Sequence, residues 1–145
     1  MNKQELMDQY KLLVNELGEH PHHVVLSAGG ALVMMGLREK TDDLDVDIQP
    51  SVFKWAALGR NVITEENVSP RVKYKENIDL HELSETTAVV CIDGVWVYSP
   101  GEMIIQKRHL ATLPNRAFGK RERDLIELTQ LESLQRNSRL CARMA

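Results

Sequence analysis

Several kinds of residue are scarce in this sequence, and each shortage excludes a class of protein. The 145 residues include only two cysteines, Cys91 and Cys141, which cannot form the disulfide framework of a small secreted domain. No apolar run approaches the ~18 residues that a membrane-spanning helix needs. The polar N-terminal residues indicate no secretory signal, so we expect a cytoplasmic protein with no membrane contact. Seven aromatic residues offer no stacking platform for single-stranded nucleic acid.

The composition is that of an ordinary globular domain, with 43% hydrophobic and 27% charged residues. Its charge is unevenly distributed. Residues 1–101 hold nine basic and sixteen acidic residues, whereas residues 102–145 hold nine basic and five acidic ones. An acidic body could hold metal ions, and a basic C-terminal part could bind phosphate or nucleic acid or be a solvated helix. We expect a single domain over 1–145, with an α/β core at 1–98 and C-terminal helices at 99–145.

The apolar patterns predict an α+β fold with a mixed sheet flanked by helices. Leucines and a tyrosine at helical spacing predict a helix over Lys3–Leu17, closed by Gly18. An Asp93-Gly94 pair between two β-rich runs predicts a hairpin. Further helices are expected over 31–37, 50–58, 100–110 and 119–134, and strands over 23–28, 43–48, 72–74, 78–80, 87–92 and 95–98.

Three aspartates alternate with apolar residues in the second predicted strand. Asp43, Asp45 and Asp47 therefore project from one face, with Cβ atoms roughly 7 Å apart. Their mutual repulsion is unfavourable unless a cation or water screens it. A divalent ion such as Mg²⁺ takes oxygen ligands of this kind. The alternative is a charged, solvent-facing edge strand that prevents aggregation.

A glycine pair, Gly29-Gly30, stands between a buried strand and a predicted helix. Glycines let backbone N–H groups approach a ligand closely, and a helix N-terminus favours anions. A phosphate-binding turn close to an acidic strand is what phosphoryl or nucleotidyl transfer requires.

The run from 26 to 30, Leu-Ser-Ala-Gly-Gly, followed after twelve residues by Asp43-Leu44-Asp45, resembles the polymerase-β-like nucleotidyltransferase superfamily. Arg38-x-x-Thr41-x-Asp43-Leu44-Asp45 is similar to a run of its minimal bacterial abortive-infection and toxin-type members. The resemblance implies a nucleotidyltransferase-like sheet with Asp43 and Asp45 as metal ligands. Asp47 remains an alternative ligand under the other register.

The same resemblance implies further site residues. Asp79 would be the third carboxylate, which binds metal and activates the acceptor hydroxyl. Glu82 also competes for this role, but alternation places it on the opposite strand face. Nucleotide binding is expected at five residues, which are Ser27, Gly29, Gly30, Lys107 and Arg123. Simpler alternatives are a surface Lys107 and an Asp124 that pairs with Lys120 on its own helix.

The expected function is transfer of NMP from an NTP such as ATP to an acceptor hydroxyl, with two Mg²⁺ ions. The acceptor would be RNA or protein, as in toxin or defence enzymes, and a partner protein or homodimer could set substrate choice. One alternative is an antibiotic-modifying nucleotidyltransferase, which the acidic body permits. Another is a non-catalytic module that binds nucleotide or a partner, as an antitoxin-like protein would.

Overall fold

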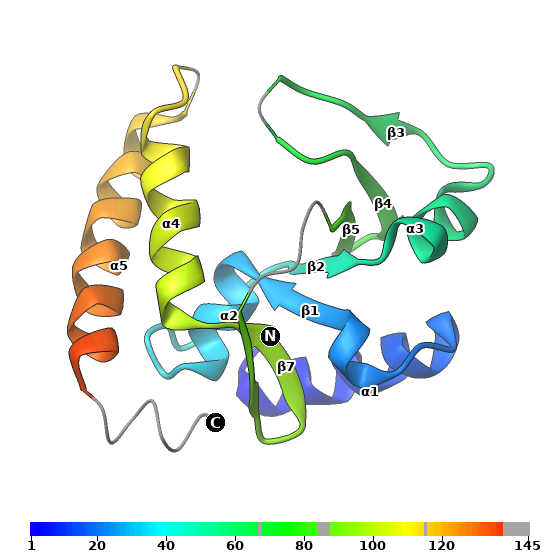
Figure 1. The fold of residues 1–145 in the computed structure, drawn as a ribbon, viewed down its shortest axis with the longest axis horizontal. Coiled ribbons are helices and arrows are strands. Elements are labelled where there is room, and N and C mark those ends of the chain that lie inside the picture. The colour runs from blue at the N-terminus through cyan, green and yellow to red at the C-terminus, as the bar shows by residue number, and fades with distance from the viewer. Residues whose placement is uncertain (67, 84–87, 115, 138–145) are drawn as a thin grey trace.

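The fold is a seven-stranded mixed sheet with helices packed around it (Figure 1). This computed structural model describes residues 1–66, 68–83, 88–114 and 116–137. The strand order is β3-β4-β5-β2-β1-β7-β6. In chain order the elements are α1 (Lys3–Leu17), η1 (Pro21–His23), β1 (Val24–Ser27), α2 (Ala28–Met34), β2 (Leu44–Ile48), α3 (Pro50–Ala57), β3 (Val62–Ile63), β4 (Arg71–Lys75), β5 (Ile78–Glu82), β6 (Val89–Ile92), β7 (Val95–Tyr98), α4 (Pro100–Ala111) and α5 (Phe118–Arg136). Among the helices of these ranges, none is both long and apolar enough to cross a bilayer.

Figure 1 shows α4 and α5 side by side at one side of the molecule, and α3, β3 and β4 at the other. Strands β1, β2 and β5 lie between these two groups. The predicted α+β class is confirmed, as is the helical C-terminal part. The proposed boundary at 98/99 falls between the end of β7 and the start of α4.

Helix α1 has the bounds that its apolar spacing predicts. Its N-terminus is closed by a capping box between Asn2 and Glu5, and Gly18 ends it in the left-handed conformation with φ 66°. Its buried face, formed by Leu6, Tyr10, Leu13 and Leu17, belongs to the main hydrophobic core. The periodicity was sufficient here because one face is wholly apolar.

The predicted Asp93-Gly94 hairpin joins β6 and β7. Both turn residues have positive φ, 50° and 83°, as a type I′ turn requires. The first strand was expected to begin at Thr87, which lies outside the described residues, and β6 begins at Val89. The short strand β3 and the 3-10 turn η1 were not predicted, because neither has a periodic pattern.

We predicted that the glycine pair precedes a helix, and this is wrong, because Gly29 and Gly30 lie inside the first turn of α2. A Cβ on Gly29 would lie 2.4 Å from Arg38 Nη1 and 2.5 Å from Thr41 Oγ1. One on Gly30 would face Leu6 and Leu26 in the core at 3.5 Å or more. Gly29 is therefore required by the close approach of the segment that leads into β2.

Helix α5 buries a different stripe from the predicted one, which ran through Leu125, Leu128 and Leu131. Leu125 is 59% exposed, and Leu131 is fully buried. The buried positions are Asp124, Glu127, Leu131 and Leu134. Two charged residues occupy the packed face because α4 supplies a buried cation opposite them.

That cation is Lys107, whose Nζ lies 2.9 Å from Asp124 Oδ1 and 3.0 Å from Glu127 Oε1. Asp124 also accepts from Arg116 Nε at 2.9 Å, and not from Lys120 as the alternative interpretation had it. Burial opposes ionisation of Asp124, but hydrogen bonds from Arg116 and Lys107 outweigh it and lower its pKa. Ionic contacts thus join α4 and α5 around Lys107, and apolar residues such as Met103 and Leu131 complete the buried faces of the two helices.

We predict that Lys107→Met destabilises the protein by about 3–5 kcal/mol, because it leaves two buried carboxylates without their shared cation. The measurement is urea-induced unfolding followed by circular dichroism. Arg108→Met is the matched control, since Arg108 pairs with Glu132 on the exposed side of the same helix and its loss is expected to cost at most about 1 kcal/mol. Equal losses in the two variants would contradict a stabilising role for the buried network.

Candidate functional site

Strand β2 lies between β1 and β5, and this pairing collects polar side chains on one face of the sheet. Asp45 is opposite Ser27 of the antiparallel β1 and opposite Asp79 of the parallel β5. Lys73 of β4 follows opposite Asp79. Because opposed residues of neighbouring strands point the same way, these four form one row, and Asp45 and Asp79 are on adjacent strands about 4.8 Å apart. We call it the first row.

A second row lies two residues farther along β2. Asp47 is opposite Val25 of β1 and His81 of β5, and His81 is opposite Arg71 of β4. The hydroxyl of Tyr98, from β7, donates a hydrogen bond to Asp47 Oδ2. The two rows therefore place three carboxylates beside two basic side chains, a histidine and a phenol.

The electrostatics of the rows follow from partial burial of like charges. Burial raises the pKa of Asp47 to about 6, although the Tyr98 hydrogen bond and His81 act in the opposite direction. Burial disfavours protonation of His81, but the hydrogen bond from its Nε2 to Asp45 Oδ1, at 3.2 Å, and the nearby aspartates outweigh it and raise its pKa. The Asp79 carboxylate lies 3.7 Å from Lys73 Nζ. Each of these carboxylates has a cation or hydrogen-bond donor as its neighbour.

Asp43 lies just before β2 and is exposed. It is two residues ahead of Asp45, and Leu44 already pairs with Ile78 of β5. Its carbonyl oxygen accepts a hydrogen bond from Thr41 Oγ1 at 3.1 Å. Asp43 thus lies where β2 begins, nearer to the first row than to the second.

Ser27 and the glycine pair lie where β1 passes into α2. The Ser27 hydroxyl is 3.4 Å from the carbonyl oxygen of Asp45. Ala28, the first residue of α2, has a positive φ of 51°, which is unusual for a residue with a side chain and marks a sharp change of direction. The predicted phosphate turn therefore begins next to the first row.

The other two predicted nucleotide ligands lie in the helical hairpin. The Lys107 side chain is 6% exposed and shared between Asp124 and Glu127, so it is not the surface lysine of the alternative interpretation. Arg123 is half exposed, with its Nε 4.0 Å from Glu127. Their nucleotide-binding roles stay predictions.

Comparison with solved structures identifies the architecture. The crystal structure of ANT(2")-Ia, an aminoglycoside nucleotidyltransferase, in complex with adenylyl-2"-tobramycin superposes with a TM-score of 0.52 and 14% sequence identity. The match covers 97% of this chain and 98% of that chain. This chain has a nucleotidyltransferase-like fold. No protein-family model and no curated protein matches the sequence.

Sequence analysis gave no role to Tyr98 or Arg38, and it preferred an exposed strand position for His81 over a role as ligand or proton carrier beside Asp79. In the structure His81 is half-buried and bonded to Asp45. Its place beside the carboxylates could have been found, because it is two residues after Asp79 and so shares its strand face. Tyr98 could not, since its contact with Asp47 depends on β7 lying beside β1. Arg38 was part of a quoted motif, but only the structure joins it to Glu127.

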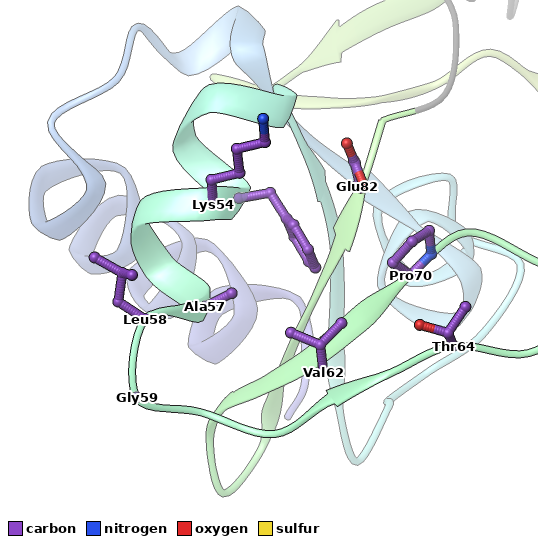
Figure 2. A pocket seen from close by; sticks show the side chains of 9 residues that line it. Lys54, Ala57, Leu58, Gly59, Val62, Thr64, Pro70 and Glu82 are labelled. Carbon is purple, nitrogen blue, oxygen red and sulfur yellow. The ribbon is translucent and has the colours of Figure 1, made fainter.

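A pocket of about 440 Å³ lies on the opposite face of the sheet (Figure 2). Lys54 and Phe53 of α3, Val62 of β3 and Glu82 of β5 are among its lining residues. Glu82 follows His81 directly, so alternation turns it away from both rows, as predicted when Asp79 was preferred as the third carboxylate. The pocket and the carboxylate rows are therefore separate features.

The carboxylate rows fit Mg²⁺ in their chemistry, because they offer hard oxygen donors from neighbouring strands. Asp45 and Asp79 are already register partners, and Asp43 precedes them on β2. As the side chains are placed, no three histidine, cysteine or acidic residues in the described ranges are close enough to hold an ion. A metal ion would have to draw the carboxylates away from His81 and Lys73.

We predict that Asp47→Asn changes how stability depends on pH. The pKa of Asp47 is about 6 in the folded protein and near 3.8 in the unfolded chain, so between these pH values only the folded protein keeps the proton. The stability that this protonation contributes is complete below pH 3.8 and is lost as the pH rises through about 6. Asparagine can still accept from Tyr98 and does not ionise. The variant should gain about 1.4 kcal/mol relative to wild type as the pH rises from 5 to 8, measured by urea unfolding with a chelator present.

The exposed Asp42→Asn serves as the control and should follow wild type at both pH values. If the two variants show the same pH dependence, the buried Asp47 carboxyl is not the group responsible.

Proposed function

We propose that the protein transfers NMP from an NTP to an acceptor hydroxyl in a reaction that depends on Mg²⁺. The observation that carries this proposal is the register pairing of Asp45 with Asp79, beside Ser27 where β1 ends. Two adjacent carboxylates next to a glycine-containing strand–helix junction suit a metal-bound polyphosphate. The nucleotidyltransferase-like fold is consistent with this chemistry.

Asp43, Asp45 and Asp79 would hold two Mg²⁺ ions, which supply positive charge to the phosphates and the leaving group when bound. Asp79 would accept the proton of the acceptor hydroxyl. The acceptor oxygen then forms its bond to the α-phosphorus while the bond to pyrophosphate breaks. Asp47, the alternative ligand, is engaged by Tyr98, which favours Asp43 with Asp45 as the metal pair.

Nucleotide binding would involve the strand–helix junction. The Ser27 hydroxyl and the backbone N–H groups of Gly29 and Gly30 would face the triphosphate, because the first N–H groups of a helix have no partner within it. Lys107, in the helical hairpin, would act on the phosphates of the nucleotide through its positive charge. Arg123 would do so from the exposed side of the same hairpin. Direct contact by Lys107 would require it to leave Asp124 and Glu127.

The acceptor we favour is RNA or protein, because residues 102–145 carry a net positive charge, with nine basic and five acidic residues. A small cationic antibiotic is the second candidate. It is supported by the adenylylated tobramycin named for the similar structure and by the exposed acidic residues Glu39, Asp42 and Asp43 near the start of β2. ATP is the first nucleotide to test.

We predict that Asp45→Asn and Asp79→Asn each lower transfer at least about 100-fold, since each removes a ligand charge from the metal site. The measurement is label transfer from α-labelled NTP in the presence of Mg²⁺. Asp8→Asn, which removes an exposed charge on α1, should keep activity within about threefold of wild type. Wild-type activity in Asp45→Asn would refute the site.

The acceptor is tested in the same assay with total RNA, cell proteins or tobramycin added separately. Label on RNA or protein supports the favoured acceptor, and label only with tobramycin supports the second candidate. If no acceptor is labelled although the protein binds NTP, the chain is a non-catalytic module that binds nucleotide or a partner protein.

A further inference from the structure

The contact that joins the helical hairpin to the acidic strand is made by Arg38. This residue lies between α2 and β2, and its side chain is 21% exposed. Its Nε lies 3.0 Å from Glu127 Oε2 on α5, and Nη2 donates to the same oxygen. The third nitrogen, Nη1, is directed at Gly29, since a Cβ there would be only 2.4 Å away. The guanidinium is thus held between two distant segments.

Glu127 is a fixed partner for Arg38. Its side chain is 6% exposed, and its other oxygen, Oε1, accepts from Lys107 Nζ at 3.0 Å. Lys107 is in turn bound to Asp124, which Arg116 also binds. A buried carboxylate between two cations cannot leave one of them without a large loss of electrostatic energy. The position of Arg38 is therefore set by α4 and α5.

The segment that carries Asp43 packs against the same glycine as Arg38, and Met1 also holds the backbone of its Thr41. Three residues after Arg38, Thr41 packs on the same glycine, where its Oγ1 would be 2.5 Å from a Cβ on Gly29. The same oxygen donates to the carbonyl of Asp43, and Leu44 N then donates to Asn77 O at 2.8 Å as β2 begins. The chain from 38 to 43 is consequently held at both ends.

We infer that Arg38, fixed by Glu127, is a positioning residue that places Asp43 for metal binding. This inference rests on the proposed function and deepens it. Arginine suits the position because its planar fork can contact Glu127 and Gly29 at once, whereas a lysine offers a single point of charge. Glu127 of α5, which is 89 positions from Arg38 in the sequence, thereby controls the geometry of a site on the sheet.

The test compares Arg38→Met, Arg38→Lys and Glu127→Gln with wild type. Four quantities are measured. They are the affinity for Mn²⁺ without nucleotide, by electron paramagnetic resonance, and then kcat, the KM for NTP and the Mg²⁺ concentration that gives half-maximal transfer. Arg38→Met and Glu127→Gln should each weaken Mn²⁺ binding and raise the half-maximal Mg²⁺ concentration by at least about tenfold. Arg38→Lys should lie between Arg38→Met and wild type.

A double variant tests whether the two residues act through one contact. Arg38→Met with Glu127→Gln should be no worse than the more severe single variant, because the second change removes nothing further. Leu17→Ala is the control for general destabilisation, since Leu17 is buried in α1. At temperatures where all variants are folded, it should leave Mn²⁺ affinity unchanged.

Three results would overturn the inference. Wild-type Mn²⁺ affinity and Mg²⁺ dependence in both single variants would exclude positioning by this ion pair. A raised KM for NTP in Arg38→Met, with Glu127→Gln unaffected, would make Arg38 a direct phosphate ligand. If wild type itself binds no Mn²⁺ and transfers no label, the proposed function fails together with this inference, whereas the first two results leave the proposed function standing.

Discussion

The position of β2 between β1 and β5 is the constraint on which the candidate site depends. The register pairs Asp45 with Ser27 and Asp79, and Asp47 with His81. A shift of one residue would turn the aspartates of β2 to the opposite face, and would bury them among the core side chains. The apolar residues of β2 prevent this, because Leu44, Val46 and Ile48 are fully buried on the other face. Hydrophobic burial therefore determines where the carboxylates can act.

Carboxylates gathered in this way need compensating partners. Lys73 and His81 bring positive charge to Asp79 and Asp45, and Tyr98 gives Asp47 a hydrogen bond. Asp47 is nonetheless driven towards its protonated form, with a pKa of about 6, because burial is the larger effect. Counted with Asp43, the site holds four carboxyl groups against Lys73, Arg71 and His81, so acidic groups outnumber basic ones. A divalent cation would complete the neutralisation, which is the physical argument for a metal site on this face.

Local patterns predicted the elements that depend on one face or one turn. The alternation in β2, the stripe of α1 and the Asp93-Gly94 turn all appear as expected, since each is determined by neighbouring residues. Contacts between distant segments were not predictable in the same way. The burial of Asp124 and Glu127 depends on Lys107, and the need for Gly29 depends on Arg38 and Thr41. No periodicity in a single sequence encodes such pairs.

The ion pairs of the helical hairpin also link it to the segment before β2. The hairpin α4–α5 lies beside the sheet (Figure 1), and its Glu127 bonds to Arg38 of that segment. An apolar contact could hold the hairpin there, but it would not specify the position of the Arg38 side chain. Glu127 does so, because a buried carboxylate requires its cation at a defined place. The polar interior of the hairpin is thus a source of geometric precision at Asp43, even if apolar residues there would have given greater stability.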